Sequence, residues 1–244
     1  MILEVKDVSV CYSLKILKGV SVRRTLLNKK KSENTELIAV KGISFELDEG
    51  DILGVIGRNG AGKSTLLKAI AGTVPVKSGS IICKGNVVAL LELGLGFDRE
   101  LTVRENIYLR AALLGFSKEY LALNYDNILN FSELNQYENY PLRTLSTGMK
   151  ARLAFAIASI AKPEILILDE VFSVGDSSFK AKSQLQMKKM IENGAVTILV
   201  SHSLNQIRNT CNKALWIEKG TMMSFGDVTT VCEEYTKFIE SQAK

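Results

Sequence analysis

Apolar residues recur with two different spacings along this chain of 244 residues. Residues 2–10 and 43–47 alternate loosely between apolar and polar side chains, which is typical of strands with one buried face. Three other stretches, 52–56, 165–168 and 195–200, are almost entirely apolar, which indicates buried strands. The link between 43–47 and 52–56 is so short that these two strands are expected to run antiparallel. The pattern therefore predicts an antiparallel β layer beside a mostly parallel sheet.

Helical periodicity alternates with these strands, so the fold class is α/β. The predicted helices lie at 65–71, 102–115, 117–130 and 151–161. The two central helices are adjacent in the sequence and each has an apolar face, which favours a separate helical lobe. A chain of this length can bury one core. We therefore expect a single domain over 1–244, with a core at about 1–101 and 163–244 and a helical lobe at about 102–162.

Residues 57–65 join the strand at 52–56 to the helix at 65–71 and match the phosphate-binding pattern G-x-x-x-x-G-K-[ST]. Glycines in this pattern let the backbone curl around an anion at the helix N-terminus. Lys63 is placed to reach the β- and γ-phosphates, and Ser64 to offer its hydroxyl to Mg²⁺. The flanking strand and helix disfavour a chance glycine-rich turn. The predicted phosphate-binding residues are Gly57, Arg58, Asn59, Gly60, Ala61, Gly62, Lys63, Ser64 and Thr65.

Two carboxylates, Asp169 and Glu170, directly follow the buried strand at 165–168. The carboxyl ends of parallel strands are where open α/β sheets bind ligands. Asp169 is therefore predicted to hold Mg²⁺, directly or through water, and Glu170 to polarise an attacking water as a general base. The alternative is a pair of helix-capping acids after a buried strand, which the phosphate-binding pattern in the same chain disfavours.

Three weaker candidates have ordinary structural alternatives. Tyr12 follows the first strand, where it would either stack on a nucleotide base or simply pack. Ser146 and Gly148 open the helix at 151–161, so Ser146 is either a helix cap or a second seat for phosphate. His202, the single histidine of the chain, follows the strand at 195–200 and is either structural or a contact of the γ-phosphate.

Composition and charge disfavour several classes of protein. The net charge of +5 is too small to predict a nucleic-acid partner by itself. The four cysteines are widely scattered, which favours reduced thiols over a metal site or a disulfide framework. No stretch approaches 18 consecutive apolar residues, so any membrane crossing is expected from another subunit.

A basic stretch lies between the first two predicted strands. Residues 18–38 are polar and irregular, and they contain Arg23, Arg24 and Lys29 to Lys31. A solvated loop is the expected structure. Contact with an anionic membrane surface is the alternative, which the acidic residues in the same stretch weaken.

Five motifs in order resemble those of ABC-transporter ATPases: 57–65, 145–149, 165–170, 173–176 and His202. The resemblance covers essentially the whole chain. It implies the ABC ATPase fold, a P-loop NTPase core with an antiparallel β layer and a helical lobe. It also implies a head-to-tail homodimer that holds two ATP molecules, with Mg²⁺, between its subunits.

The resemblance also assigns roles to single residues. Tyr12 matches the aromatic residue that stacks on adenine, and His202 matches the switch histidine at the γ-phosphate. Ser146 and Gly148 match the signature residues that face the P-loop of the other subunit. Asp176 matches the aspartate that crosses the interface between the subunits.

Two departures from the general pattern resemble one branch of the family, the ATPase subunits of polysaccharide exporters. The signature reads Ser-Thr-Gly-Met at 146–149, and residues 84–104 contain no glutamine to sense the permease. The resemblance implies export of a lipid-linked polysaccharide or glycopolymer, with the chain bound peripherally at the cytoplasmic face of the cell membrane. Leu91 to Phe97 is an apolar, glycine-broken segment that we expect to dock on the transmembrane permease.

Three rival functions remain after this resemblance. An ATPase of another transporter class, for lipids or drugs, would share the same motifs. A soluble ABC ATPase of translation would carry two cassettes, whereas this sequence has one P-loop, and a DNA-repair relative would contain long heptad repeats. A non-catalytic module is disfavoured because Lys63, Glu170 and His202 are all present.

Overall fold

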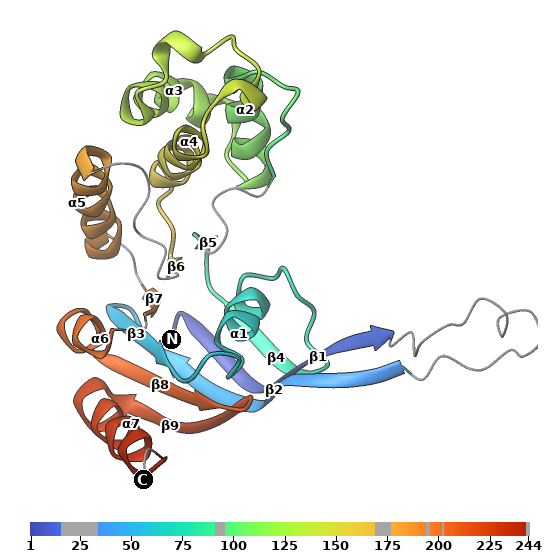
Figure 1. The fold of residues 1–244 in the computed structure, drawn as a ribbon, viewed down its shortest axis with the longest axis vertical. Helices are drawn as coiled ribbons and strands as arrows, with labels where there is room; N and C mark the ends of the chain where they lie inside the picture. Colours follow the sequence, from blue (N-terminus) through green and yellow to red (C-terminus); the bar gives the residue numbers. More distant parts are fainter. Residues whose placement is uncertain (16–33, 91–95, 169–176, 194–195, 202, 243–244) are drawn as a thin grey trace, which may run out of the picture.

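The computed structural model describes residues 1–15, 34–90, 96–168, 177–193, 196–201 and 203–242 (Figure 1). The described residues form two β-sheets with helices around them, and a helical lobe lies at one end of the molecule (Figure 1). The predicted α/β fold is confirmed.

The larger sheet has six strands in the order β5-β6-β7-β3-β8-β9. Their bounds are β3 Asp51–Ile56, β5 Val87–Ala89, β6 Ile165–Leu168, β7 Val196–Val200, β8 Lys213–Glu218 and β9 Thr221–Asp227. All neighbours are parallel except β8 and β9. Every residue of β6 and β7 is buried, because the two faces of these strands contribute to two separate hydrophobic clusters. Burial on both faces explains their continuous apolar runs.

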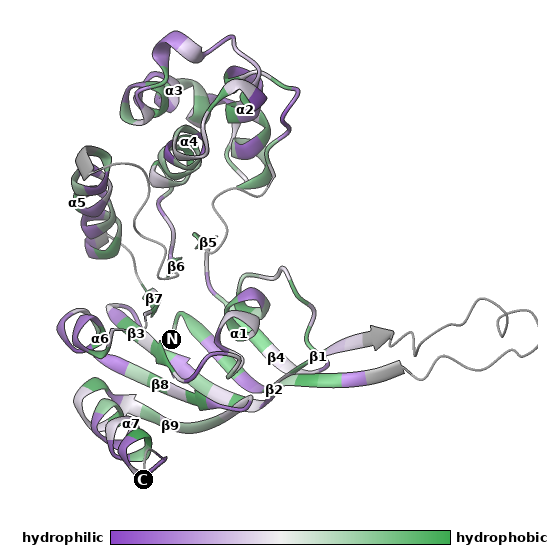
Figure 2. Ribbon diagram, viewed as in Figure 1, coloured by the Kyte–Doolittle hydropathy of each residue, from purple (hydrophilic) through white to green (hydrophobic). Residues whose placement is uncertain are grey.

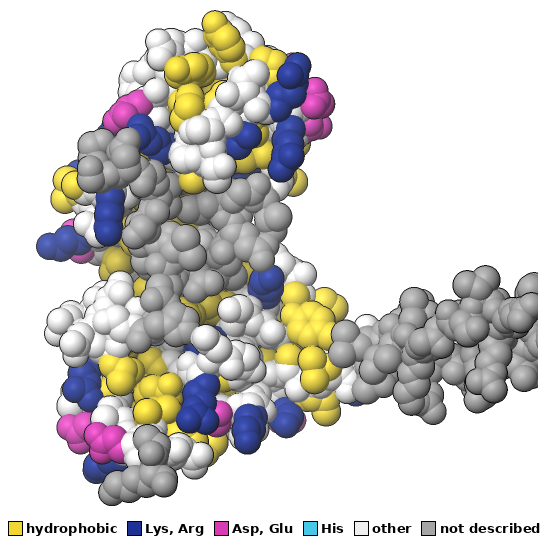
Figure 3. All heavy atoms as spheres, viewed as in Figure 1, with side chains coloured by type: hydrophobic (Ala, Val, Ile, Leu, Met, Phe, Trp, Pro, Cys, Tyr) yellow, Lys and Arg dark blue, Asp and Glu magenta, His cyan; other side chains and the backbone are white. Residues whose placement is uncertain are grey.

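The smaller sheet is antiparallel, with the order β2-β1-β4. Its strands are β1 Leu3–Lys15, β2 Asn34–Leu47 and β4 Ser78–Cys83. Strand β2 begins earlier than expected, so residues 34–38 are strand and not irregular loop. The rest of the basic stretch, with Arg23, Arg24 and Lys29 to Lys31, lies outside the described residues. Hydrophobic side chains gather on the surface over β1 and β2 (Figure 3).

The predicted antiparallel β layer is present as the smaller sheet, but β2 and β3 do not pair as the short link between them suggested. Strand β3 pairs with β7 on one side and with β8 on the other, so it has no free edge for β2. The short link between them instead carries the chain from one sheet to the other. The Asp51 carboxylate holds this turn, since its Oδ2 accepts from the Asp48 amide at 2.7 Å and from the Lys213 ammonium at 2.7 Å.

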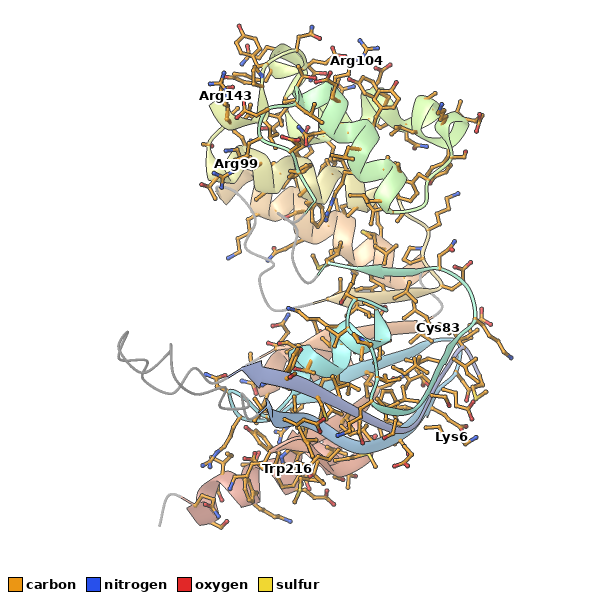
Figure 4. The ribbon with its side chains drawn as sticks, turned by 90° about the vertical axis from the view of Figure 1, so that its right-hand side faces the viewer. Lys6, Cys83, Arg99, Arg104, Arg143 and Trp216 are labelled. Carbon is orange, nitrogen blue, oxygen red and sulfur yellow. The ribbon has the colours of Figure 1, made fainter. Side chains whose placement is uncertain are left out.

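The helical lobe contains α2 Val103–Leu113, α3 Lys118–Ser132 and α4 Thr147–Ser159, with 3-10 turns at Asn135–Tyr137 and Leu142–Thr144. Most of its buried hydrophobic residues form a cluster of their own, whereas Phe155 and Ala158 of α4 belong to a cluster of the larger sheet. Thr102 and Glu105 cap α2 reciprocally, and Ser117 caps α3. Three arginines, Arg99, Arg104 and Arg143, lie on the surface of this lobe (Figure 4).

The remaining helices cover the larger sheet. They are α1 Lys63–Ile70, α5 Ser177–Asn193, α6 Leu204–Thr210 and α7 Val228–Gln242. Helices α5 and α7 carry both hydrophobic and hydrophilic residues (Figure 2). Each contributes buried side chains to the same cluster, Met187 and Met190 from α5 and Val231 and Cys232 from α7.

The segment expected to dock on a permease is only partly described, because residues 91–95 lie outside the described part of the chain. Phe97 differs from the expectation. It is half-buried and packs against the core of the helical lobe, and the Arg110 guanidinium lies 5.7 Å from its ring centroid. The apolar character of Phe97 therefore serves the packing of this chain.

Candidate nucleotide site

The predicted phosphate-binding loop connects β3 to α1, as the motif requires. Three of its glycines have positive φ angles, 146° at Gly57, 75° at Gly60 and 107° at Gly62. A Cβ atom at Gly57 would lie 2.1 Å from the Ile217 carbonyl oxygen, and one at Gly62 would lie 2.5 Å from the Ala39 carbonyl oxygen. Only glycine fits such close backbone approach with these φ angles. The backbones of β8 and β2 therefore shape the loop from outside it.

Two backbone hydrogen bonds link the phosphate-binding loop to the turn between β8 and β9 and to β2. The Gly220 amide, in the turn between β8 and β9, donates to the Ala61 carbonyl at 2.8 Å, and the Lys41 amide of β2 donates to the Gly220 carbonyl at 2.8 Å. The turn thus joins the loop to both sheets. A rigid loop is pre-organised to bind an anion without a cost of ordering its backbone.

Lys63 is buried at the base of the loop, with 7% of its surface exposed. Its ammonium donates to the Gly57 carbonyl at 2.7 Å and to the Arg58 carbonyl at 3.0 Å. These contacts curl the side chain back over the loop backbone. The cation is therefore held on the concave side of the loop, where the phosphates of a nucleotide would need a counter-charge.

The N-terminus of α1 differs from those of other helices. Thr102, Ser117, Ser146 and Ser203 cap α2, α3, α4 and α6 through their side chains. Helix α1 is preceded by Gly62, its cap makes no side-chain hydrogen bond among the described residues, and its first turn has no acidic residue. The amides of a helix start that lack a protein acceptor attract anions. This arrangement fits the phosphates of ATP.

Ser64 and Thr65 lie in the first turn of α1, and Ser64 is exposed. The Tyr12 hydroxyl lies 3.5 Å from Thr65 Oγ1, at the long limit of a hydrogen bond. Tyr12 lies within β1, which continues beyond the predicted end, and 37% of its surface is exposed. The structure thus brings an accessible aromatic ring beside the phosphate-binding loop.

Arg58 and Asn59 are the exposed residues at the tip of the loop, together with Gly60. The Arg58 guanidinium carbon lies 5.8 Å from the Phe238 ring centroid on α7. Phe238 in turn packs on Trp216 of β8, with ring centroids 5.0 Å apart. Trp216 is labelled in Figure 4. Sequence reasoning missed this contact, because helix α7 follows the loop by more than 160 residues and carries no local signal for it.

Asp169, Glu170, Asp176 and His202 lie outside the described residues. The strands before them are described, and β6, β7 and β3 are consecutive parallel neighbours in the sheet. Asp169 follows β6 directly, and His202 follows Ser201 at the end of β7. Because carboxyl ends of parallel strands share one edge, both chain segments leave the sheet at the edge that carries the phosphate-binding loop.

Ser201 is a residue of this edge that sequence reasoning missed. It is buried, its hydroxyl donates to Gln206 Oε1 at 2.9 Å, and its oxygen accepts from the Ser203 amide at 3.0 Å. These bonds hold the turn on both sides of position 202. The small polar residue before His202 is the signal that sequence reasoning could have used.

Comparison with known proteins decides the family. The profile of the ABC transporter family matches residues 40–173. The O-antigen export system ATP-binding protein RfbB of Klebsiella pneumoniae is 40% identical over 198 residues, covering 81% of this chain and 80% of that protein. The chain belongs to the ABC transporter family.

Another relative of this ABC chain also belongs to an export system, and a solved structure shares its fold. The teichoic acids export ATP-binding protein TagH of Bacillus cereus is 38% identical over 214 residues, covering 88% of this chain but 39% of that protein. A dimeric ATP-binding cassette bound to ADP and Pi has a TM-score of 0.68 and 20% identity, covering 93% of this chain and 98% of that one. The resemblance to the exporter branch is confirmed.

The signature segment of this ABC chain lies at the start of α4. Ser146 caps the helix, its hydroxyl oxygen accepting from the Met149 amide at 3.2 Å. Gly148 is exposed, and a Cβ added there would meet only the Ser146 hydroxyl, at 3.9 Å. The fold of one subunit therefore does not require glycine at 148, in contrast to Gly57 and Gly62.

Within the described residues, no helix is both long and apolar enough to cross a membrane.

Proposed function

We propose that this chain hydrolyses ATP as the nucleotide-binding subunit of an ABC exporter for a lipid-linked polysaccharide or glycopolymer. The observation that carries the proposal is the uncapped start of α1 beside the buried Lys63, at the carboxyl edge of a parallel sheet. Membership of the ABC transporter family and the export systems of its relatives support it. The whole chain then acts as one ABC ATPase domain.

Each residue of the loop has a distinct task in this proposal. The Lys63 ammonium and the amides of 57–65 hold the phosphates, and Tyr12 stacks on adenine. Ser64 and Asp169 hold Mg²⁺, which supplies positive charge against the phosphates when bound. Glu170 accepts the proton of the attacking water.

His202 and the signature segment complete the site. His202 contacts the γ-phosphate at the same sheet edge. Ser146, Gly148 and Asp176 act on the nucleotide of a second copy of the chain, so that a homodimer closes over two ATP molecules. The open space around Gly148 supports this role, because close approach of a partner is a reason for glycine that the single subunit does not provide.

The exporter needs further components. A transmembrane permease subunit supplies the path for the glycan, and the chain binds to it at the cytoplasmic face of the membrane. ATP-driven closure of the two ATPase subunits and their reopening after hydrolysis then switch the permease between two states. No nucleic acid takes part.

Two substitutions test the composite site. Ser146→Arg and Gly148→Leu both add bulk where the partner's γ-phosphate would lie, and both positions are exposed in the single subunit. We expect each variant to bind ATP like the parent and to lose dimer formation and turnover. Thr147→Leu is a control for added bulk at the neighbouring exposed position.

The export function is tested in cells. Deletion of the gene should remove the exported glycan from the cell surface, and the parent chain should restore it, whereas Ser146→Arg should not. Normal turnover of the Ser146→Arg chain would contradict the composite site. Normal surface glycan after deletion would contradict the proposed substrate and favour another transporter class.

A further inference from the structure

Helices α3, α4 and α5 meet in a cluster that no part of the proposed function uses. Each helix contributes one phenylalanine, Phe131 from α3, Phe155 from α4 and Phe179 from α5. The ring centroids lie 5.9 Å apart for Phe131 and Phe155, 5.5 Å for Phe131 and Phe179, and 6.2 Å for Phe155 and Phe179. Phe155 and Phe179 are fully buried. Every ring therefore touches a ring from each of the other helices.

One carboxylate joins the same helices by charge. Glu133 follows α3, and its Oε2 accepts from Arg152 Nη1 of α4 at 2.7 Å. Its Oε1 lies 3.5 Å from the Lys182 ammonium of α5. That ammonium also donates to the Phe131 carbonyl at 2.9 Å. Glu133 thus pairs with a cation from each of the two neighbouring helices.

The two cations also cover rings of other helices. The Arg152 guanidinium carbon of α4 lies 5.1 Å from the Phe179 ring centroid of α5. The Lys182 nitrogen of α5 lies 4.7 Å from the Phe131 ring centroid of α3. Such contacts are attractive and depend on direction. We call Glu133, Arg152, Lys182 and the three rings the three-helix junction.

Two helices of the three-helix junction begin next to residues that the proposed function places at the partner's nucleotide. Arg152 lies in the helix that Ser146 caps, and Phe179 lies in the helix that begins directly after Asp176. A second contact joins the same two helices farther along, from the Gln186 amide to the Ser159 carbonyl at 3.2 Å. Helix α5 lies beside the helical lobe (Figure 1). It is therefore fastened to the signature helix as well as to the sheet.

We propose that Glu133 is a positioning residue for the composite nucleotide site. By binding α4 and α5 together, it keeps the start of the signature helix and the start of α5 in one relative placement. The segments that contain Ser146 and Asp176, which act on the partner's nucleotide in the proposed function, then approach the partner subunit together. This inference rests on the proposed function of Ser146 and Asp176.

The test compares two substitutions of glutamate by glutamine. Glu133→Gln keeps the size of the side chain and removes the charge from the junction. Glu192→Gln is the matched control, because Glu192 also pairs with a lysine of α5, Lys188, at 3.8 Å, but on the exposed face of that helix and outside the three-helix junction. Lys182→Gln removes one partner of Glu133 and is a second variant in case Glu133→Gln folds poorly. Glu133→Asp is the conservative variant.

Two quantities separate positioning from general stability. The first is the affinity of the monomeric subunit for fluorescent ATP, which reports the phosphate-binding loop. The second is the dissociation constant of the ATP-bound dimer, measured by analytical ultracentrifugation in a Glu170→Gln background. For Glu133→Gln we expect nucleotide affinity within about twofold of the parent and a dimer weakened about three- to tenfold, in the lower part of the range of coupling within one network. Lys182→Gln should act in the same direction, and Glu133→Asp should restore part of the loss.

Each other outcome has a defined meaning. Equal dimer affinity for Glu133→Gln and Glu192→Gln would overturn the inference. Equal losses of nucleotide affinity and dimer affinity in Glu133→Gln would also overturn it, because a purely structural role affects both. A parent chain that neither binds ATP nor dimerises would instead overturn the proposed function, on which the inference depends.

Discussion

Asn106 of α2 is the most heavily bonded buried polar side chain in the described part of the helical lobe, and its replacement should destabilise the lobe. It is fully buried. Its amide nitrogen lies 2.8 Å from the Asp98 carbonyl, 3.1 Å from the Leu101 carbonyl and 2.9 Å from the Thr102 carbonyl. Its oxygen accepts from the Asp98 amide at 2.9 Å. One side chain thus fastens residues 98–102 to the helix.

The magnitude follows from the groups left without a partner. Asn106→Ala removes the donor for the carbonyls and the acceptor for the Asp98 amide. A buried group that loses its partner costs about 1–3 kcal/mol, so two such groups, one carbonyl and the Asp98 amide, cost about 2–6 kcal/mol. At about 2–4 °C per kcal/mol for a chain of this size, the melting temperature should fall by about 4–24 °C.

The assay needs a matched control in the same lobe. Asn127 is exposed on α3, and Asn127→Ala should change the melting temperature by less than about 2 °C. Hydrogen exchange supplies a local readout, because the Asp98 amide should exchange slowly in the parent and much faster in Asn106→Ala. Equal melting temperatures for the two variants, or an unchanged rate at Asp98, would refute this reasoning.

Two further predictions concern Phe97 and the cysteines. Phe97→Ser should destabilise the isolated chain by about 1–3 kcal/mol in urea unfolding, because the half-buried ring packs on the helical lobe and on Arg110. An unchanged urea midpoint would instead support a role for Phe97 in docking on the permease. Burial raises the pKa of the Cys211 thiol to about 12, so this thiol stays protonated at pH 8. Because it is also buried, Cys211 should resist iodoacetamide, whereas the half-exposed Cys11 should react. Peptide mass mapping after brief alkylation measures both, and equal labelling would contradict the assigned burial.

The sequence predicted the elements that local pattern determines. Strands β6 and β7 were visible as apolar runs, since burial on both faces removes polar positions. The phosphate-binding loop was visible because its glycines and lysine stand at fixed spacing between a strand and a helix. These features need no knowledge of distant residues.

Features that depend on distant backbone were not predictable in the same way. The pairing of β3 is set by β7 and β8, which lie far along the chain, so a short link to β2 gave the wrong neighbour. The reason for glycine at 57 and 62 is contact with Ile217 and Ala39, which the local pattern does not contain. Phe97 was assigned to a partner because its packing against the helical lobe is tertiary.

The proposed roles of the remaining site residues are still predictions. Glu170 is the residue on which the proposed chemistry depends most, since it is the proposed base for the attacking water. Lys63 is the residue on which nucleotide binding depends most, because its buried ammonium is placed over the loop. Replacing each one separates binding from chemistry.

The most direct measurement is therefore phosphate release and dimer formation by the parent, Lys63→Ala and Glu170→Gln chains, each with ATP and Mg²⁺. The parent should hydrolyse ATP, and Lys63→Ala should neither bind nor hydrolyse it. Glu170→Gln should bind ATP, lose about 10²–10⁴-fold in turnover and elute as a stable dimer in size-exclusion chromatography. Hydrolysis by Glu170→Gln at the parental rate, with no ATP-dependent dimer, would contradict the account.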